Sequence, residues 1–437
     1  MEVVDVYKVD IAVARRKELQ QVTGSNRFRS QYQACAIELS SLRRSDLLLA
    51  LGAGGGASLL STLCVVNRSE EKLTTVVIVP SVQRLNSLRA RLRNARATVR
   101  EWKVEALNMI PTPQVLLVFA ATAATAEFRD FIVARCHAKV IARIIFDRIE
   151  AFVSPPLLSL AIKFDFRRKL AEGLVPFLGT STALPPDVVS IIMRQMHFQP
   201  GDTQLVRDPS LLPNSAHLSV FPLLSPANCS VADAIFSPIE SQTLSILDYI
   251  RDALGRFQAQ DRALIFCSSS QIASEFAAAL PCVSYPVGAS AGGQKSVMDS
   301  WRARNAALKA LAITSGSEVD FDYDNIQLVI HYEAPQNIYT FLRESAKAGR
   351  GGQPAHVTTF WHAGVRQTPA SNMDDLGVEE MTAYLRTEHC RRVVLLPPAN
   401  TCGKDSTAAL CDNCLSQLAH ASIVSLWRQL FNTESRH

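Results

Sequence analysis

The sequence lacks the long apolar runs that mark a membrane protein. Its longest apolar stretch, residues 115–126, falls well short of the roughly 20 residues that a membrane-spanning helix needs. The N-terminus carries acidic residues and has no basic start followed by an apolar core, so we expect no signal peptide. The sequence also lacks a strong excess of either charge. The 45 Lys and Arg against 40 Asp and Glu leave a net charge of +5, which permits a polyanionic partner without requiring one.

Charged residues are few, at 19%, while hydrophobic residues make up 48%, and this balance excludes a largely disordered chain. A length of 437 residues exceeds one compact core and suits two or three domains. We therefore expect a soluble, intracellular, multidomain protein that has no membrane partner. In such a chain the ten cysteines indicate free thiols or metal ligands before disulfides.

Short apolar runs alternate with helix-length stretches along most of the chain. This pattern is typical of parallel sheets buried on both faces, so the sequence predicts an α/β fold class. We expect a first parallel-sheet lobe at residues 1–220, a second at residues 240–368, and a small cysteine-bearing module at residues 376–437. Connecting loops are expected at residues 222–238 and 368–375. The expected strands lie at residues 47–51, 75–80, 115–120, 141–146, 175–180, 263–267, 309–314 and 327–332, and an amphipathic helix at residues 241–257.

A glycine-rich segment, 51-LGAGGGASLL-60, follows the first expected strand. Glycines between a strand and a helix let backbone N–H groups approach an anion. Residues 52–57 fit a dinucleotide fingerprint, although the next strand ends in Pro and Ser where a ribose-binding acid belongs. Residues 54–58 also fit a phosphate-binding loop with Ala57 in the place of its lysine. A plain turn without a ligand is the third interpretation.

Four of the cysteines fall close together near the C-terminus, with the spacing C-x11-C-x8-C-x2-C. Four thiolates suit a tetrahedral Zn²⁺ ion, and a small module with little core of its own gains its order from such an ion. The sequence therefore predicts a zinc site, with four unrelated thiols as the alternative. The predicted ligands are Cys390, Cys402, Cys411 and Cys414.

A series of segments then follows one order that resembles a known family. The chain resembles the RecQ-type DNA helicases of superfamily 2 over roughly residues 25–415, and among them a divergent fungal, telomere-linked-like branch. The segments that carry the resemblance are 28-FRSQYQACAI-37, 51-LGAGGGASLL-60, 76-VVIVPSVQRL-85, 144-IIFDRIEAF-152, 178-LGTSTALPP-186, 263-ALIFC-267, 311-LAITSGSEVDFDYDNIQLVIHYEAP-335, 342-LRESAKAGRGGQPA-355, 390-CRRVV-394 and 411-CDNC-414.

This resemblance implies two tandem RecA-like lobes plus a small C-terminal zinc-binding helical module. It implies a 3′–5′ DNA helicase that uses ATP and Mg²⁺, acts on single-stranded or junction DNA, and works in the nucleus in DNA repair and recombination. The residues implied for ATP are Gln33, which resembles the family's adenine reader, with Gly54, Gly55, Gly56 and Ser58 of the phosphate loop. The residues implied for catalysis are Asp147 on Mg²⁺, with Lys347 and Arg350 on the transition-state charge.

Several of these positions depart from the family pattern. Arg148 stands where the water-orienting glutamate belongs, and losing a positioned base costs typically about 10²–10⁴-fold in rate. Ala57 replaces the loop lysine, and Lys347 replaces an arginine whose forked geometry a lysine cannot offer. We therefore predict weakened or lost ATP hydrolysis. The alternatives are a non-enzymatic nucleic-acid-binding or relic scaffold protein and, more distantly, a dinucleotide-binding oxidoreductase. Taken alone, Asp147 is interpreted as a strand-end acid paired with Arg148 or Arg143, and 343-RESAKAGR-350 as a solvated helix face.

Residues 84–103 carry many arginines against one acid, Glu101. Arg89, Arg93, Arg96 and Arg100 recur at helical spacing, so they predict a basic stripe that tracks phosphates, or else a solvated helix face. The segment 164-FDFRRKL-170 resembles in part the family's aromatic loop that couples DNA to ATP. Phe166 and Arg167 are its candidate nucleic-acid residues.

Overall fold

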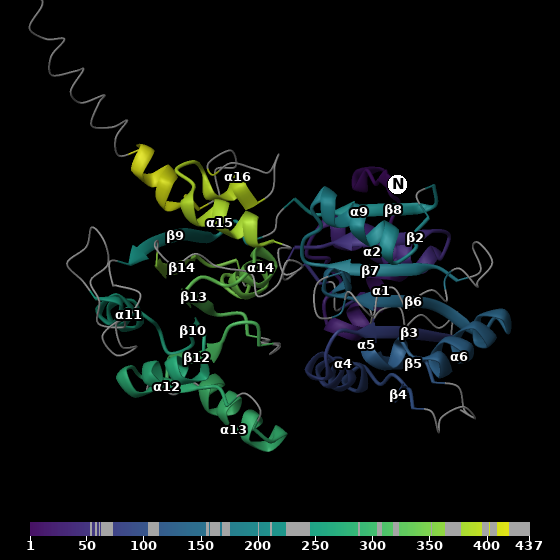
Figure 1. Ribbon diagram of the computed structural model, residues 1–437, viewed down its shortest axis with the longest axis horizontal. Helices are drawn as coiled ribbons and strands as arrows, with labels where there is room; N and C mark the ends of the chain where they lie inside the picture. Colours follow the sequence, from purple (N-terminus) through teal and green to yellow (C-terminus); the bar gives the residue numbers. More distant parts are fainter. Residues whose placement is uncertain are drawn as a thin grey trace, which may run out of the picture. The chain divides into compact units, whose positions relative to one another are not determined.

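The computed structural model places the chain in two compact units that divide between residues 211 and 212 (Figure 1). Each unit is an α/β lobe built on a parallel sheet, as the apolar runs predict. None of the helices in the described part of the chain is long and apolar enough to cross a bilayer. The structure describes residues 1–52, 55–56, 59–60, 62, 73–103, 113–153, 157, 167, 175–199, 201–209, 212–223, 245–286, 289–303, 308–317, 323–350, 352–362, 377–395, 402 and 409–418.

The first lobe is an eight-stranded sheet in the order β1-β8-β2-β7-β6-β3-β5-β4, and its neighbours pair in parallel. Its central strands are buried along their whole length, because helices cover both faces. The strands are β1 (Glu2–Val3), β2 (Asp46–Ala50), β3 (Thr74–Val79), β4 (Val99–Glu101), β5 (Val115–Phe119), β6 (Ile141–Asp147), β7 (Phe177–Ser181) and β8 (Thr203–Arg207). The helices are η1 (Val6–Lys8), α1 (Val13–Thr23), α2 (Gln31–Leu42), α4 (Val82–Asn94), α5 (Ala120–Ala123), α6 (Ala126–His137), α7 (Ile149–Phe152) and α9 (Pro186–Gln195).

The second lobe is a six-stranded parallel sheet in the order β11-β12-β10-β13-β14-β9. The strands are β9 (Ala216–Leu223), β10 (Arg262–Cys267), β11 (Cys282–Ser284), β12 (Ala310–Thr314), β13 (Ile326–Tyr332) and β14 (Ala355–His362). The helices are α11 (Ile246–Gly255), α12 (Ser270–Ala279), α13 (Ala291–Arg302), α14 (Ile338–Ser345), α15 (Val378–Arg386) and α16 (Arg391–Leu395), and residues 412–418 are also helical.

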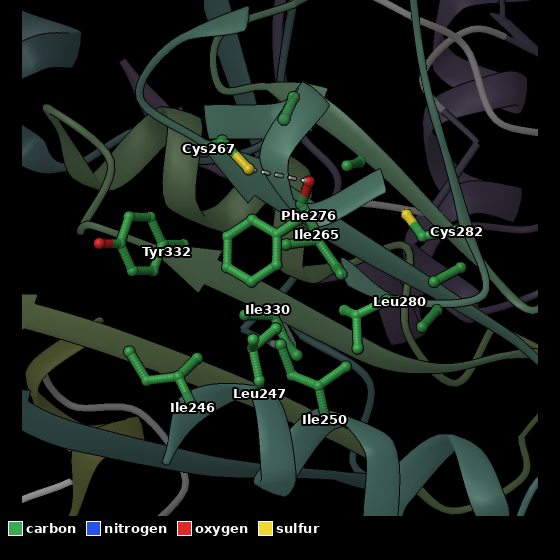
Figure 2. Close-up of a cluster of buried hydrophobic side chains, with 14 of the residues drawn as sticks. Ile246, Leu247, Ile250, Ile265, Cys267, Phe276, Leu280, Cys282, Ile330 and Tyr332 are labelled. Carbon is green, nitrogen blue, oxygen red and sulfur yellow. Dashed lines mark hydrogen bonds between the residues drawn. The ribbon is translucent and has the colours of Figure 1, made fainter. Parts of the chain in front are cut away.

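One face of the second sheet carries an apolar core (Figure 2). Helix α11 lays one side against it, as the predicted helical spacing requires, and begins at Ile246 because the Ser245 hydroxyl accepts a hydrogen bond from the Asp248 N–H. The other contributors come from strands and helices far apart in the chain. They include Ile265 of β10, Ile330 and Tyr332 of β13, and Phe276 of α12.

The boundary expected at residue 220 falls inside a strand. Strand β9 starts at Ala216 and pairs along its whole length with β14, so the second sheet begins before that boundary. The sequence does not reveal this pairing, because the partner strand lies more than a hundred residues away and Pro222 is typical of the start of a connector. Residues 224–238 of the expected connector and the loop expected at residues 368–375 lie outside the described residues.

Candidate functional site

The carboxyl end of β6 holds a buried ion pair. Asp147 is the last residue of this strand, and its Oδ2 lies 2.6 Å from Nε of Arg84, while its Oδ1 accepts a hydrogen bond from Nη2 at 3.0 Å. The side chains of Arg84 and Asp147 are only 5% and 2% exposed. The pair forms because β3 and β6 are adjacent parallel strands, so their carboxyl ends meet at the same edge. Arg84 lies in the first turn of α4, which follows β3 and is capped by Ser81.

This pair decides how Asp147 compares with a magnesium ligand. A Mg²⁺ ion requires carboxylate oxygens at about 2.0–2.1 Å and a near-ideal octahedral shell. Both oxygens of Asp147 already face one guanidinium, whose positive charge would oppose a second cation at the same carboxylate. Asp147, paired in this way, therefore does not fit the ion that the family resemblance implies. Asp147 is instead a strand-end acid in an ion pair, with Arg84 as its partner.

Arg148, the residue at the expected glutamate position, begins helix α7 in the left-handed conformation, with φ of 58°. Its N–H donates to the hydroxyl of Thr180 on β7 at 3.4 Å. A cation and a strained backbone therefore stand where the family places a carboxylate for the attacking water.

The glycine-rich segment is held by Gln33 of α2. The Gln33 side chain is buried, and its Nε2 donates to the Gly55 carbonyl oxygen at 3.1 Å, while its Oε1 accepts from the Arg29 N–H at 2.8 Å. Gly56 has φ of +89°, and a Cβ there would lie 2.0 Å from Gln33 Nε2, so only glycine fits. The structure thus brings Gln33, Gly55 and Gly56 together, with the glutamine amide committed to backbone groups. Gly54, Ala57 and Ser58 lie outside the described residues.

In the second lobe, a buried carboxylate joins the ends of two strands to α14. Glu344 accepts a hydrogen bond from the Gly316 N–H at 2.7 Å and from the Ser315 hydroxyl at 3.1 Å. Nδ1 of His331 lies 3.2 Å from Glu344 Oε2, and its Nε2 lies 3.0 Å from the Ser345 hydroxyl. The sequence alone did not single out Glu344. One feature of the sequence could have pointed to it. Glu344 is a lone acidic residue in the helix that follows the apolar strand ending in His331 and Tyr332.

The segment after α14 carries the two expected catalytic cations. Lys347 is 6% exposed, and the residues from Glu344 to Gly349 are buried, so the alternative of a solvated helix face at residues 343–350 is wrong. Arg350 is half-buried, and its Nε donates to the Ala346 carbonyl oxygen at 3.2 Å. Lys347 and Arg350 therefore lie in one turn of chain directly beyond the Glu344 network.

The expected basic stripe does not continue along one helix. Helix α4 carries Arg89 and Arg93 but ends at Asn94, since Arg96 adopts φ of 60°. Arg100 lies in strand β4. Arg93 and Arg96 are exposed, and Arg89 pairs with Glu101. The four arginines thus belong to one helix–turn–strand unit rather than to one helical face.

Arg167 has a structural role in the first lobe. Its Nη2 donates to Asp46 Oδ2 at 2.8 Å, its Nη1 donates to the Val175 carbonyl oxygen at 2.8 Å, and its guanidinium lies 4.4 Å from the ring centre of Phe177. Asp46 starts β2, and burial raises its pKa even though Arg167 acts against that rise. The buried charge of Arg167 is thus held by Asp46 and a backbone carbonyl, and this arrangement does not favour the nucleic-acid contact expected from the sequence. Phe166 lies outside the described residues.

The four predicted zinc ligands come together in the C-terminal module. The sulfur atoms of Cys390, Cys402, Cys411 and Cys414 all lie within 4.8 Å of one another. Four thiolates about 2.3 Å from one Zn²⁺ ion lie about 3.8 Å apart, so these residues fit that ion. The hydrogen bond from the Cys402 thiol lowers the pKa of Cys411, and the N–H of Arg391, 3.5 Å from its sulfur, acts in the same direction against the effect of burial. This environment favours a thiolate at Cys411.

The sequence comparisons give weak likeness to helicases over part of the chain. No protein-family model matches the chain. It is 23% identical over 194 residues to the bifunctional 3′-5′ exonuclease/ATP-dependent helicase WRN of Mus musculus, covering 39% of this chain and 14% of that protein. It is 22% identical over 149 residues to the ATP-dependent DNA helicase RecQ of Pasteurella multocida, covering 30% of this chain and 23% of that protein. The matches thus span a quarter or less of these relatives.

Solved helicase structures share the fold over most of the chain. The helicase MrfA bound to DNA aligns with a TM-score of 0.60 and 11% identity, over 83% of this chain and 52% of that one. The Mycobacterium smegmatis helicase Lhr bound to single-stranded DNA and AMP-PNP aligns with a TM-score of 0.58 and 17% identity, over 86% and 50%. Dbp5 of S. cerevisiae bound to RNA and ADP BeF3 aligns with a TM-score of 0.56 and 13% identity, over 86% and 92%. The chain therefore has two parallel-sheet α/β lobes with the fold of these RecA-like helicase structures.

Proposed function

We propose that this protein is a RecQ-like, nucleic-acid-binding helicase homologue in which ATP-driven strand separation has been weakened or lost. The single observation that carries the proposal is the buried ion pair between Arg84 and Asp147. It removes from use the carboxylate on which the family's Mg²⁺ chemistry depends. Both parallel-sheet lobes are still formed, so the chain can keep a nucleic-acid-binding surface even if it no longer hydrolyses ATP.

Three residues of the first lobe point in the same direction. Asp147 is committed to a guanidinium, Arg148 places a positive charge where a carboxylate would orient water, and Ala57 lacks the lysine that contacts the β- and γ-phosphates. The second lobe retains Arg350, but a transition-state arginine cannot act without the metal and the base. Nucleotide binding through the backbone of the glycine-rich segment is compatible with all three changes.

The nucleic acid that we propose is DNA, single-stranded or at a junction, in the nucleus. The order of sequence motifs supports DNA, because it resembles RecQ helicases, and the RecQ relative is described as an ATP-dependent DNA helicase. The exposed Arg93 and Arg96, with Arg89 beside them, offer positive charge for a phosphate backbone. Zinc in the C-terminal module would be structural, since all four ligand positions are filled by thiolates.

One experiment with two measurements tests the proposal. The purified 437-residue chain is titrated with fluorescent single-stranded DNA at several salt concentrations, and ATP hydrolysis is measured with and without that DNA. We expect DNA binding that weakens as salt rises, and no DNA-stimulated hydrolysis. The variants Arg93→Ala and Arg96→Ala should each weaken binding and lower the salt slope by about 1, because each removes one cation from the phosphate backbone. Arg251→Ala on α11, an exposed arginine paired with Asp248, is the matched control.

Two results would contradict the proposal in different ways. DNA-stimulated ATP hydrolysis that disappears in Asp147→Ala would show that the motor is active and that the ion pair opens during turnover. Absence of DNA binding at low salt would favour the relic scaffold alternative over a nucleic-acid-binding protein.

A further inference from the structure

Strand β9 lies at one end of the second sheet among the strands that the structure describes, with β14 on its inner side. The outer side of such a strand presents backbone N–H and C=O groups that pair readily with another strand. In this protein the C-terminal module covers that side. Asp412 Oδ2 accepts a hydrogen bond from the Val220 N–H at 2.9 Å, and Arg392 Nη2 donates to the Ala216 carbonyl oxygen at 2.6 Å.

The cover extends to the turn before β9. The Ala409 N–H donates to the Asn214 carbonyl oxygen at 2.7 Å, and a ring nitrogen of His217 contacts the Leu410 carbonyl oxygen. Each residue of the module that makes these contacts lies within two positions of a cysteine of the cluster. Ala409, Leu410 and Asp412 flank Cys411, and Arg392 follows Cys390 by two.

Arg391 connects the two halves of the module. Its Nε donates to Asp412 Oδ1 at 2.6 Å and its Nη2 to Asp412 Oδ2 at 2.9 Å, while its Nη1 donates to the Tyr384 carbonyl oxygen of α15 at 2.8 Å. The side chain is buried. Cys390 and Cys411 are 21 positions apart in sequence, so an ion bound by both would fix Arg391 and Asp412 opposite each other. The contacts on β9 therefore depend on the same cysteines that fit zinc.

We propose that the four-cysteine module is a metal-dependent cover for strand β9, and that loss of the metal opens this strand for pairing with β9 of a second copy of the chain. The strand stays in place without its cover, because it is paired with β14 over all eight residues. Its sequence, AHLSVFPL, is mainly apolar and suits strand pairing. Two copies of one edge related by a two-fold axis form a closed, isologous contact, which favours a dimer.

The outer side of β9 also limits the length of the new contact. Backbone N–H groups alternate in direction along a strand, so residues 218 and 222 face the same way as Val220. Pro222 has no N–H to offer. The pairing segment is therefore Ala216–Val220, long enough for a specific contact and too short for an extended stack of sheets.

The experiment compares the zinc-loaded chain with the chain after removal of the metal by a chelator under reducing conditions. Amide hydrogen exchange is followed in the peptide that covers β9, and molecular mass is followed by light scattering, both in dilute and in concentrated solution. In the dilute metal-free chain we expect the outward-facing Val220 amide to exchange at least tenfold faster, while the amides that face β14 stay protected. In the concentrated metal-free chain we expect a dimer in which the protection of β9 returns.

Two variants separate the cover from the metal itself. Asp412→Ala removes the contact to Val220 and leaves all four cysteines, so it should bind one zinc ion and still expose β9. Arg392→Met tests the same cover from the Ala216 end and leaves the pair between Arg391 and Asp412 intact. Asp299→Ala, which changes an exposed acid on α13 of the same lobe, is the control and should behave as the original chain.

Protection of β9 that is unchanged by metal removal at every concentration would overturn the proposal. A metal-free chain that exposes β9 but stays monomeric when concentrated would also overturn it, because the occupant would then be another molecule. A dimer in which the β9 amides stay exposed would place the contact elsewhere and count equally against it.

Discussion

The sharpest test of the first lobe is the substitution Arg84→Met, which keeps the length of the side chain and removes its charge. Asp147 would then stay buried, with its side chain 2% exposed, without the guanidinium that faces both of its oxygens. Breaking a buried ion pair by removing one partner costs about 3–5 kcal/mol. Two charge-assisted hydrogen bonds of about 1.5–3 kcal/mol each give a similar sum. We expect the first lobe to lose about 3–5 kcal/mol of unfolding free energy.

The assay is urea unfolding followed by hydrogen exchange, which resolves the two lobes separately. With an m-value of about 2 kcal/mol/M, the unfolding midpoint of peptides from β3 and β6 should fall by about 1.5–2.5 M. Peptides from β10 and β13 belong to the second lobe and serve as the internal control. The midpoint of the original chain should not depend on the magnesium concentration, because Asp147 does not fit that ion.

The double variant Arg84→Met/Asp147→Leu is the matched comparison. Replacing both members of a buried ion pair by apolar residues is often neutral or stabilising, so most of the stability that the single variant loses should return. The reasoning is refuted if Arg84→Met costs less than about 1 kcal/mol, or if the double variant is no more stable than the single one, because the pair would then not be an energetic unit.

The remaining predictions concern the metal, the second sheet and the buried thiols. The chain should bind one zinc ion, and Cys402→Ser should weaken zinc binding and shift the release of the ion, measured with a chromophoric chelator, to lower chelator concentration. The His356 side chain is exposed, but partial desolvation first, and then the neighbouring His217, lower its pKa, so its neutral form is favoured in the fold. The resulting stability is present above the unfolded pKa of about 6.5 and is lost as pH falls. His356→Gln should therefore flatten the slope of second-lobe unfolding free energy between about pH 7 and 5. Burial raises the pKa of Cys35 to about 11 and that of Cys136 to about 12, so a thiol reagent at about pH 8 should leave both unmodified in the folded chain and modify both after unfolding.

Much of the fold follows from local sequence features. Several strands are short, apolar and buried on both faces, so each could be predicted without knowing which strand it pairs with. These are β2, β3, β5, β6, β10, β12 and β13. The strands β8, β9 and β14 were missed, because polar residues interrupt them and their place depends on pairing with distant segments. Helix α11 begins later than expected since its capping serine lies inside the predicted range.

The candidate sites likewise differ in whether the sequence alone could predict them. The cysteine cluster could be predicted, because its ligand types and its close C-x2-C pair carry the information locally. The ion pair at Asp147 could not, because Arg84 is 63 positions away and looks like one arginine in a basic run until β3 and β6 are placed side by side. Glu344 was missed for the same reason, since its partners Gly316 and His331 come from two other segments.

The guanidinium opposite Asp147 is covalently part of the chain, and this has a consequence for how the lobe responds to its surroundings. A dissociable ion comes and goes with its concentration, so a lobe that depends on it registers the composition of the solution. Arg84 cannot dissociate from the chain as a bound ion can, and its charge persists at every physiological pH. The cation opposite Asp147 is therefore set when the chain folds and does not depend on the concentration of any ion in solution.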